Sequence, residues 1–193
     1  MERSRTSNML FVNVAEERIK NIFLETANQF TELSELNIIL RQSKIKGSTM
    51  QAQPIVNGKS LFKGIDAFRI RLATKVRDSQ TLCVKDLPDE VLMGWFAHEL
   101  GHVIDYQSRS ALSMIGFGLK YLFSRSFRLE AEHRADKIAI EKGFLDQILI
   151  TKKYILDHHL IEDSYKDKIK KYYMSENDAR TYAMAQVSID PVD

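Results

Sequence analysis

The sequence predicts an α+β protein in which a helix and a small sheet precede a mostly helical half. Apolar residues recur at helical spacing near the N-terminus, and strand-like patterns follow up to Val84. Almost everything after Asp86 has the periodicity of helices. A chain of 193 residues can bury one sizeable core, so we expect a single domain over 1–193.

Residues 14–36 are expected to form one amphipathic helix. Its apolar residues recur at helical spacing and are Ile19, Ile22, Phe23, Phe30 and Leu33.

The preceding apolar patch, 9–12, is too short for a signal-peptide core, and the single cysteine fits a reducing compartment, so we expect a cytoplasmic protein. No stretch of about 20 apolar residues is present, so no transmembrane segment is expected.

The middle of the chain predicts a small, mostly antiparallel sheet of three to five strands. Residues 37–40 form a short apolar run, and Asn57-Gly58 is a hairpin signal because both residues tolerate the positive φ of a type I′ turn. Residues 68–72 alternate between apolar side chains and arginine, which is typical of a half-buried strand. Residues 81–84 are one more strand candidate.

The second half predicts a series of helices. Asp86 is the expected N-cap of the first, with Pro88 in its first turn and an end near Gln107. A second helix is expected over about 127–142, with Gly143 as the residue that ends it. Further helices should begin near Asp146, Ser164 and Ser175, the last two in sequences that resemble capping boxes.

The motif His98-Glu99-Leu100-Gly101-His102 carries the clearest chemistry. His98 and His102 lie four residues apart, so both imidazoles share one face of a helix and can reach one ion. Zinc favours such nitrogen ligands in a tetrahedral arrangement. Glu99 lies about 100° round the helix, where it can act as a general base on a metal-bound water. Gly101 inside the motif permits close approach by a neighbouring element.

Two histidines need at least one more protein ligand. Glu132 and Asp136 lie four apart in the second helix, so one carboxylate can bind the metal while the other accepts the remaining N–H of a ligand histidine. Glu130, His133 and Asp105 are competing ligands. Glu130 is expected to face elsewhere, because it lies about 200° from Glu132 round the helix.

The HELGH motif followed by Glu132-x-x-x-Asp136 resembles the gluzincin metallopeptidases, in particular soluble relatives of the CAAX-prenyl protease and the bacterial heat-shock membrane protease. The resemblance covers about 96–143. It implies a zincin-like fold, with helix, sheet and motif helix over about 14–107 and a helical half with the third ligand over 108–193. It also implies a Zn²⁺ ion and these roles: His98, His102 and Glu132 as metal ligands, Glu99 as the catalytic base, and Asp136 as the partner of a ligand histidine.

The expected function is therefore zinc-dependent hydrolysis of peptide bonds, with Glu99 as the general base and a peptide or protein as substrate. The alternative is a non-catalytic metal-binding module for regulation or interaction, or the self-inhibited precursor of a peptidase. A formal net charge of only +2 does not predict nucleic-acid binding. Candidate donors for the oxyanion of the tetrahedral intermediate lie downstream: Tyr154, His158, His159, Tyr172 and Tyr173.

Residues 111–123 form an apolar segment between the two ligand-bearing helices. One interpretation is a core helix. The other is an apolar flap over the cleft, with Gly116 and Gly118 as hinges. In the second case the segment could also make weak contact with a membrane or another hydrophobic surface.

Overall fold

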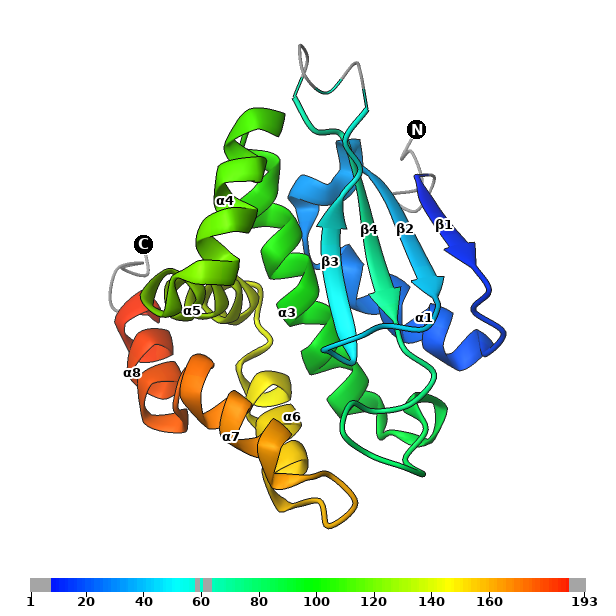
Figure 1. The fold of residues 1–193 in the computed structure, drawn as a ribbon, viewed down its shortest axis with the longest axis vertical. Helices are drawn as coiled ribbons and strands as arrows, with labels where there is room; N and C mark the ends of the chain where they lie inside the picture. Colours follow the sequence, from blue (N-terminus) through cyan, green and yellow to red (C-terminus); the bar gives the residue numbers. More distant parts are fainter. Residues whose placement is uncertain (1–7, 58–59, 61–63, 188–193) are drawn as a thin grey trace.

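The computed structural model describes residues 8–57, 60 and 64–187 and shows an α+β fold with a four-stranded mixed sheet (Figure 1). The strands are β1 (Met9–Val12), β2 (Asn37–Gln42), β3 (Met50–Pro54) and β4 (Ala67–Leu72). Their order in the sheet is β1-β2-β4-β3. The pairs β1–β2 and β2–β4 are parallel, and β3 is antiparallel to β4. Strand β3 therefore has a free edge.

The expectation of a mostly antiparallel sheet is wrong. The apolar patch at the N-terminus forms β1, and helix α1 (Glu17–Asn28) then returns the chain to the same end of the sheet, so β1 and β2 run parallel. The expected helix over 14–36 is shorter than predicted, because a separate 3₁₀ turn, Thr31–Glu35, follows α1. Apolar periodicity reports which face is buried, and it does not report strand direction.

Two further predictions about the sheet need correction. Strands β3 and β4 are antiparallel neighbours, but residues 55–66 connect them instead of a two-residue turn at Asn57-Gly58. Gly58 itself lies outside the described residues. Residues 81–84 form no strand: a single bridge joins Lys75 to Cys83, and a 3₁₀ helix, Val84–Asp86, follows directly.

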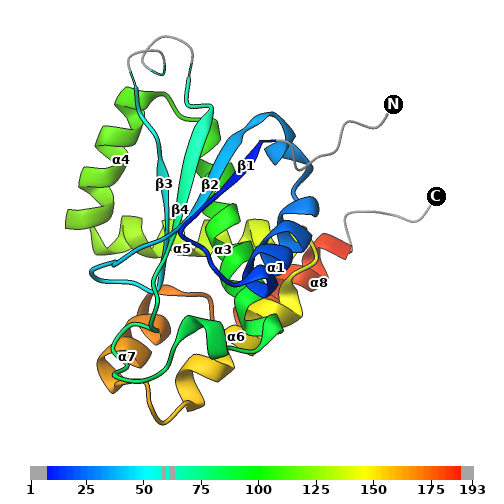
Figure 2. The same cartoon turned by 90° about the vertical axis from the view of Figure 1, so that its right-hand side faces the viewer.

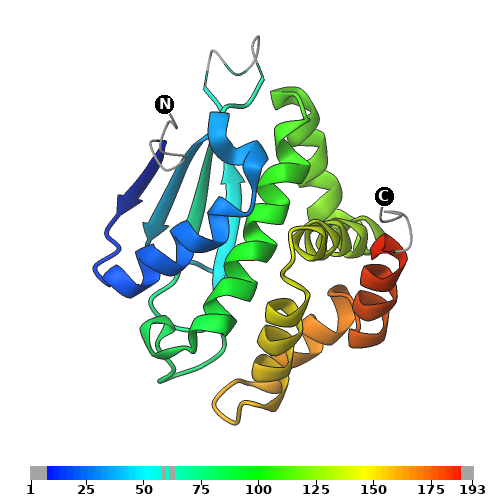
Figure 3. The ribbon, with the colours of Figure 1, turned by 180° about the vertical axis from the view of Figure 1, so that it is seen from behind.

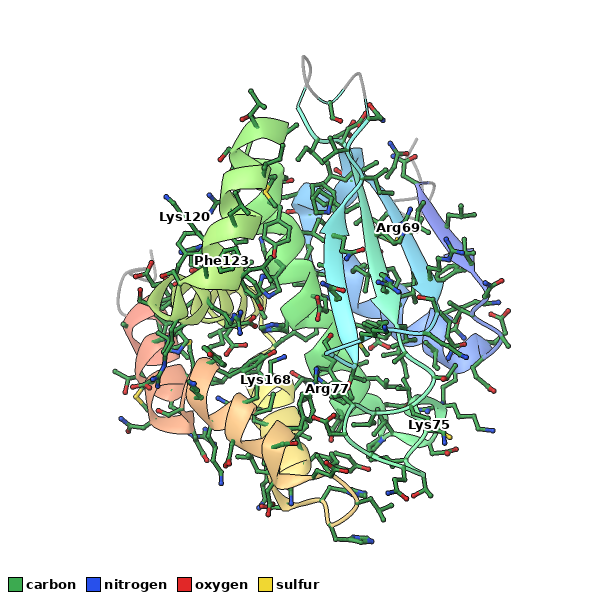
Figure 4. All side chains as sticks on the ribbon, in the orientation of Figure 1. Arg69, Lys75, Arg77, Lys120, Phe123 and Lys168 are labelled. Carbon is green, nitrogen blue, oxygen red and sulfur yellow. The ribbon has the colours of Figure 1, made fainter. Side chains whose placement is uncertain are left out.

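Helices α1 and α3 (Asp89–Gln107) cover one face of the sheet, as the side view and the back view show (Figures 2 and 3). The alternation predicted for 68–72 is confirmed. Phe68, Ile70 and Leu72 are fully buried beneath the helices, whereas Arg69 lies on the open face (Figure 4). One hydrophobic core extends from the N-terminal elements into the helical half.

The helical half contains α4 (Ala111–Phe123), α5 (Arg125–Glu141), α6 (Leu145–Asp157), α7 (Asp163–Tyr172) and α8 (Glu176–Val187). Gly143 has a φ of +89° directly after α5, as its predicted role requires. Ser175 caps α8 by accepting a hydrogen bond from the Asp178 N–H at 3.1 Å, but Ser164 lies inside α7. Asp86 is not the N-cap of α3, because that helix begins after Pro88. Within the described ranges, no helix has both the length and the apolar character to cross a bilayer.

Helix α3 is the centre of the molecule. It contacts α1 and β3 on one side and α5 and α6 on the other. Both contacts with the helical half occur at glycines. A Cβ at Gly101 would lie 2.4 Å from the carbonyl oxygen of Ala135 on α5, and one at Gly94 would lie 2.2 Å from that of Gln147 on α6. The absence of a side chain at these positions therefore sets the distance between α3 and its neighbours.

Replacing Gly101 by Ala should destabilise the protein, because the new methyl group would force two backbones apart. The expected loss in the free energy of unfolding is about 1–3 kcal/mol, as for other overpacked cores. Gly116→Ala is the matched control. It is also a glycine inside a helix, but nothing lies within 4 Å of its added Cβ, so helix propensity should make it neutral or stabilising by up to about 1 kcal/mol. Urea denaturation of both variants measures the difference, and equal stabilities would contradict the close packing.

Candidate metal centre

Three buried side chains from α3 and α5 converge on one point. His98 and His102 project from consecutive turns of α3, and Glu132 projects from α5. The Oε2 atom of Glu132 lies 3.1 Å from Nε2 of His98 and 3.5 Å from Nε2 of His102. The potential ligand atoms of the three residues all lie within 4.8 Å of one another. The group could therefore hold a metal ion.

Asp136 orients the first histidine. Its Oδ1 atom lies 2.7 Å from Nδ1 of His98, so the imidazole donates on that side and turns Nε2 toward Glu132. The other carboxylate oxygen, Oδ2, accepts the N–H of Met174 at 3.1 Å. Asp136 is thus held by the segment between α7 and α8. Carboxylates that fix ligand histidines in this way raise the basicity of the metal-binding nitrogen.

The buried groups shift one another's ionisation strongly. Burial by itself lowers the pKa of His98, but the hydrogen bonds to Asp136 and Glu132 outweigh it and raise the pKa to about 10. Burial also opposes ionisation of Glu132, but the imidazoles of His102 and His98 hold its pKa well below the usual range. The metal-free centre therefore contains an imidazolium and an ionised carboxylate at neutral pH.

Glu99 lies beside the three converging residues and is also buried. Its Oε2 atom accepts the backbone N–H of Ala52 at 2.6 Å, which connects α3 to the edge strand β3. Burial raises the pKa of Glu99, while the nearby His102 and His98 oppose this shift. A raised pKa makes a carboxylate a stronger base than an ordinary glutamate.

An open cleft of about 470 Å³ leads to the centre. His98, Glu99, His102 and Glu132 line it together with residues of β3, α4 and α7. Its apolar part includes Met114 and Phe117 of α4. Figure 4 shows Lys168 on the side of α7 that faces the sheet, where its ammonium group also lines the cleft.

Three tyrosines surround the histidines. Tyr121 donates its hydroxyl hydrogen bond to Oε1 of Glu132. The ring centroid of Tyr173 lies 5.0 Å from that of His98, and the ring of Tyr106 stacks on His102 at 5.5 Å. Sequence analysis missed Tyr106 and Tyr121. Tyr106 could have been found, since it lies one helical turn after His102, but nothing in the apolar segment singles out Tyr121.

Tyr173 is the one downstream oxyanion candidate that lines the cleft. Tyr154 packs against His158, whose ring stacks on that of His159. Tyr172 lies against the guanidinium group of Arg128. These four candidates are not among the described residues that line the cleft.

The competing ligands lie elsewhere. Glu130 is exposed, as expected for the opposite side of α5. His133 lies outside the converging group. Asp105 accepts a hydrogen bond from Arg109 at 2.8 Å and another from Arg134 at 3.3 Å, so arginines occupy its Oδ1 atom.

The segment 111–123 combines features of both interpretations given above. It is a regular helix, α4, and Phe117 is buried as in a core helix. Leu119, however, is 55% exposed, and part of the helix lines the cleft. Neither Gly116 nor Gly118 has a positive φ, so the backbone at both positions is ordinary helix.

Glu132→Ala should weaken metal binding by more than about 100-fold, because it removes a carboxylate from the converging group, where even the loss of a supporting partner costs about 10–100-fold. Glu130→Ala is the control, since it removes an exposed carboxylate from the same helix. Competition with a fluorescent chelator measures both affinities. Unchanged affinity in Glu132→Ala would exclude Glu132 as a ligand.

Metal uptake at pH 8 should release a proton from His98, because a pKa of about 10 keeps its imidazole protonated in the metal-free protein. Asp136→Asn should reduce this release, since it removes the main group that raises the pKa. Titration calorimetry in two buffers of different ionisation enthalpy counts the protons. Equal counts for the two proteins would contradict the role given to Asp136.

Comparisons with models of protein families, with curated proteins and with solved structures find no match to this chain. The centre is therefore characterised by its own geometry. It consists of two histidines and one glutamate that converge, an aspartate that orients one histidine, and a second glutamate beside them in an open cleft.

Proposed function

We propose that the protein is a zinc-dependent peptidase. The observation that carries this proposal is the position of Glu99, a buried carboxyl group beside a possible His–His–Glu metal site at the end of an open cleft. Two imidazoles and one carboxylate are a typical ligand set for catalytic zinc, which keeps a fourth position for water or substrate. A structural zinc would need a fourth protein ligand, and the group found among the described residues has three.

In the proposed reaction, His98, His102 and Glu132 would hold the zinc ion, which would supply Lewis-acid chemistry to the scissile carbonyl group and to a water molecule. Glu99 takes a proton from this water and passes it to the leaving amine. Burial raises its pKa above the ordinary value, which favours uptake of the proton from water. Its hydrogen bond with the Ala52 N–H holds the carboxylate in place beside the histidines.

Tyr173 is the proposed donor to the oxyanion. It lines the cleft beside His98, and burial raises its pKa well above the usual value, so its hydroxyl stays protonated. Tyr121 is a weaker candidate because its hydroxyl already donates to Glu132. A neutral donor directed at the developing negative charge is what the tetrahedral intermediate requires.

The shape of the cleft favours an extended peptide. The cleft runs between the free edge of β3 and the inner face of α4. A sheet edge can offer backbone groups to a peptide strand, apart from the Ala52 N–H that Glu99 accepts, and α4 offers apolar contacts to its side chains. An edge strand beside a motif helix also supports a zincin-like fold, and the spacing of Glu132 and Asp136 supports a gluzincin-type enzyme.

Glu99→Gln should keep its metal but lose turnover by about 10²–10⁴-fold, because an amide cannot act as the general base. Glu90→Gln is the matched control, since Glu90 is an exposed residue in the first turn of the same helix. Cleavage of a mixed library of quenched fluorescent peptides by the zinc-loaded proteins measures the effect. Normal turnover by Glu99→Gln would assign the base to another residue. A zinc-loaded wild type without activity would favour a non-catalytic metal-binding module.

A further inference from the structure

Helix α4 carries an apolar surface that faces away from the molecule. Met114, Phe117 and Tyr121 point inward and line the cleft. Five large apolar side chains are 55–84% exposed, and these are Leu112, Ile115, Leu119, Leu122 and Phe123, of which Leu122 also lines the cleft. We call them the outer face of α4. They are five of the ten exposed large hydrophobic side chains among the described residues, so this surface is concentrated on one helix of 13 residues.

The five side chains form one continuous strip. With about 100° between successive residues, all of them fall within about 100° of the helix circumference. Contiguous apolar surface of this kind is rare on a monomer in water and marks a contact site. The backbone of α4 is regular, so its helix is already formed before any contact.

The charged residues of α4 and its flanking sequence are all basic. The stretch 107–129 contains four basic residues and no Asp or Glu. Lys120 and Arg125 are exposed and form no ion pair with any described residue, and the ammonium group of Lys120 lies 5.8 Å from the centroid of the Phe127 ring. Lys120 lies beside the apolar strip on the helical wheel. Arg125 is the first residue of α5, which follows α4 after Ser124. Figure 4 shows Lys120 and Phe123 on the part of the molecule away from the sheet.

The other two cations of this stretch are already engaged. Arg109 is paired with Asp105 at 2.8 Å. The guanidinium group of Arg128 lies over the rings of Tyr121 and Tyr172 at 5.0 and 5.2 Å. Lys120 and Arg125 are therefore the exposed cations of this stretch, next to the apolar strip.

We propose that the outer face of α4 binds the surface of a membrane that contains anionic lipids. A helix with an apolar face and cationic flanks lies in the interface, with its apolar side chains in the acyl boundary and its cations among the headgroups. Lys120 can extend its ammonium group to the phosphates while its methylene groups stay beside the apolar strip. At about 1.5 Å per residue the helix is far too short to span a bilayer, so it lies on the surface.

The charge pattern favours lipid over a second copy of this chain. A symmetric contact between two outer faces would place the cations of both copies in one interface, and 107–129 supplies no acid to compensate them. An anionic lipid surface attracts the same charges. Bound in this way, the protein would hold its cleft close to the lipid headgroups, because the inner face of α4 lines that cleft.

Co-sedimentation with vesicles tests the inference without any measurement of peptidase activity. The probe is the full chain with vesicles of phosphatidylcholine alone or with about one third phosphatidylglycerol. We expect binding to the anionic vesicles, little binding to the neutral ones, and weaker binding at high salt, since salt screens the headgroup charge. Failure of the wild type to bind the anionic vesicles would overturn the inference.

Two double variants separate the apolar contribution to vesicle binding from the ionic contribution. Leu119→Asp combined with Phe123→Asp should abolish binding, and Lys120→Glu combined with Arg125→Glu should weaken it on the order of tenfold or more. Leu160→Asp is the control, because Leu160 is an exposed apolar residue between α6 and α7. All substituted side chains are exposed, so thermal unfolding should be nearly unchanged.

Two further outcomes would contradict the inference. Equal binding to neutral and anionic vesicles would overturn the role of the two cations. If the wild type does not bind vesicles but is a dimer in light scattering, and the combined Leu119→Asp and Phe123→Asp variant is a monomer, then the outer face of α4 binds a second copy of the chain. Since neither readout involves the metal, loss of metal binding or of peptidase activity would leave the lipid result intact.

Discussion

The close contact of α3 with α5 at Gly101 is the constraint on which the centre depends. Only a residue without a side chain lets the two backbones approach at this point, where a Cβ would lie 2.4 Å from the carbonyl oxygen of Ala135. Ala135 follows Glu132 by one turn and directly precedes Asp136. The same contact therefore brings one carboxylate within 3.1 Å of His98 Nε2 and another within 2.7 Å of its Nδ1.

The second constraint is the charge that this approach buries. The carboxylates of Glu132 and Asp136 and two imidazoles are buried together at the end of the cleft, and isolated buried charges would be costly. Their arrangement compensates the cost, since His98 lies between Glu132 and Asp136 and gains a proton that both stabilise. A divalent cation bound at the same point would replace that proton and neutralise the same carboxylates.

The two residue pairs of the centre could be predicted because each pair depends on helical periodicity. The i, i+4 spacing of His98 and His102, and of Glu132 and Asp136, places each pair on one face. The contact of Glu99 with Ala52 could not be predicted, because a backbone N–H leaves no trace in the sequence. The parallel strands were also missed, since alternating burial is the same in both directions and β1 has only four residues.

The hydrogen bond from the Met174 N–H to Asp136 affects when the centre can form during synthesis of the chain. Synthesis proceeds from the N-terminus, so His98, Glu132 and Asp136 leave the ribosome before the residue that fixes the aspartate. A nascent chain can bring the ligand helices together earlier, but the carboxylate that orients His98 gains this backbone donor only after residue 174 has emerged. The centre is thus completed after its ligand helices have been made, and a chain that ends before residue 174 lacks this last support.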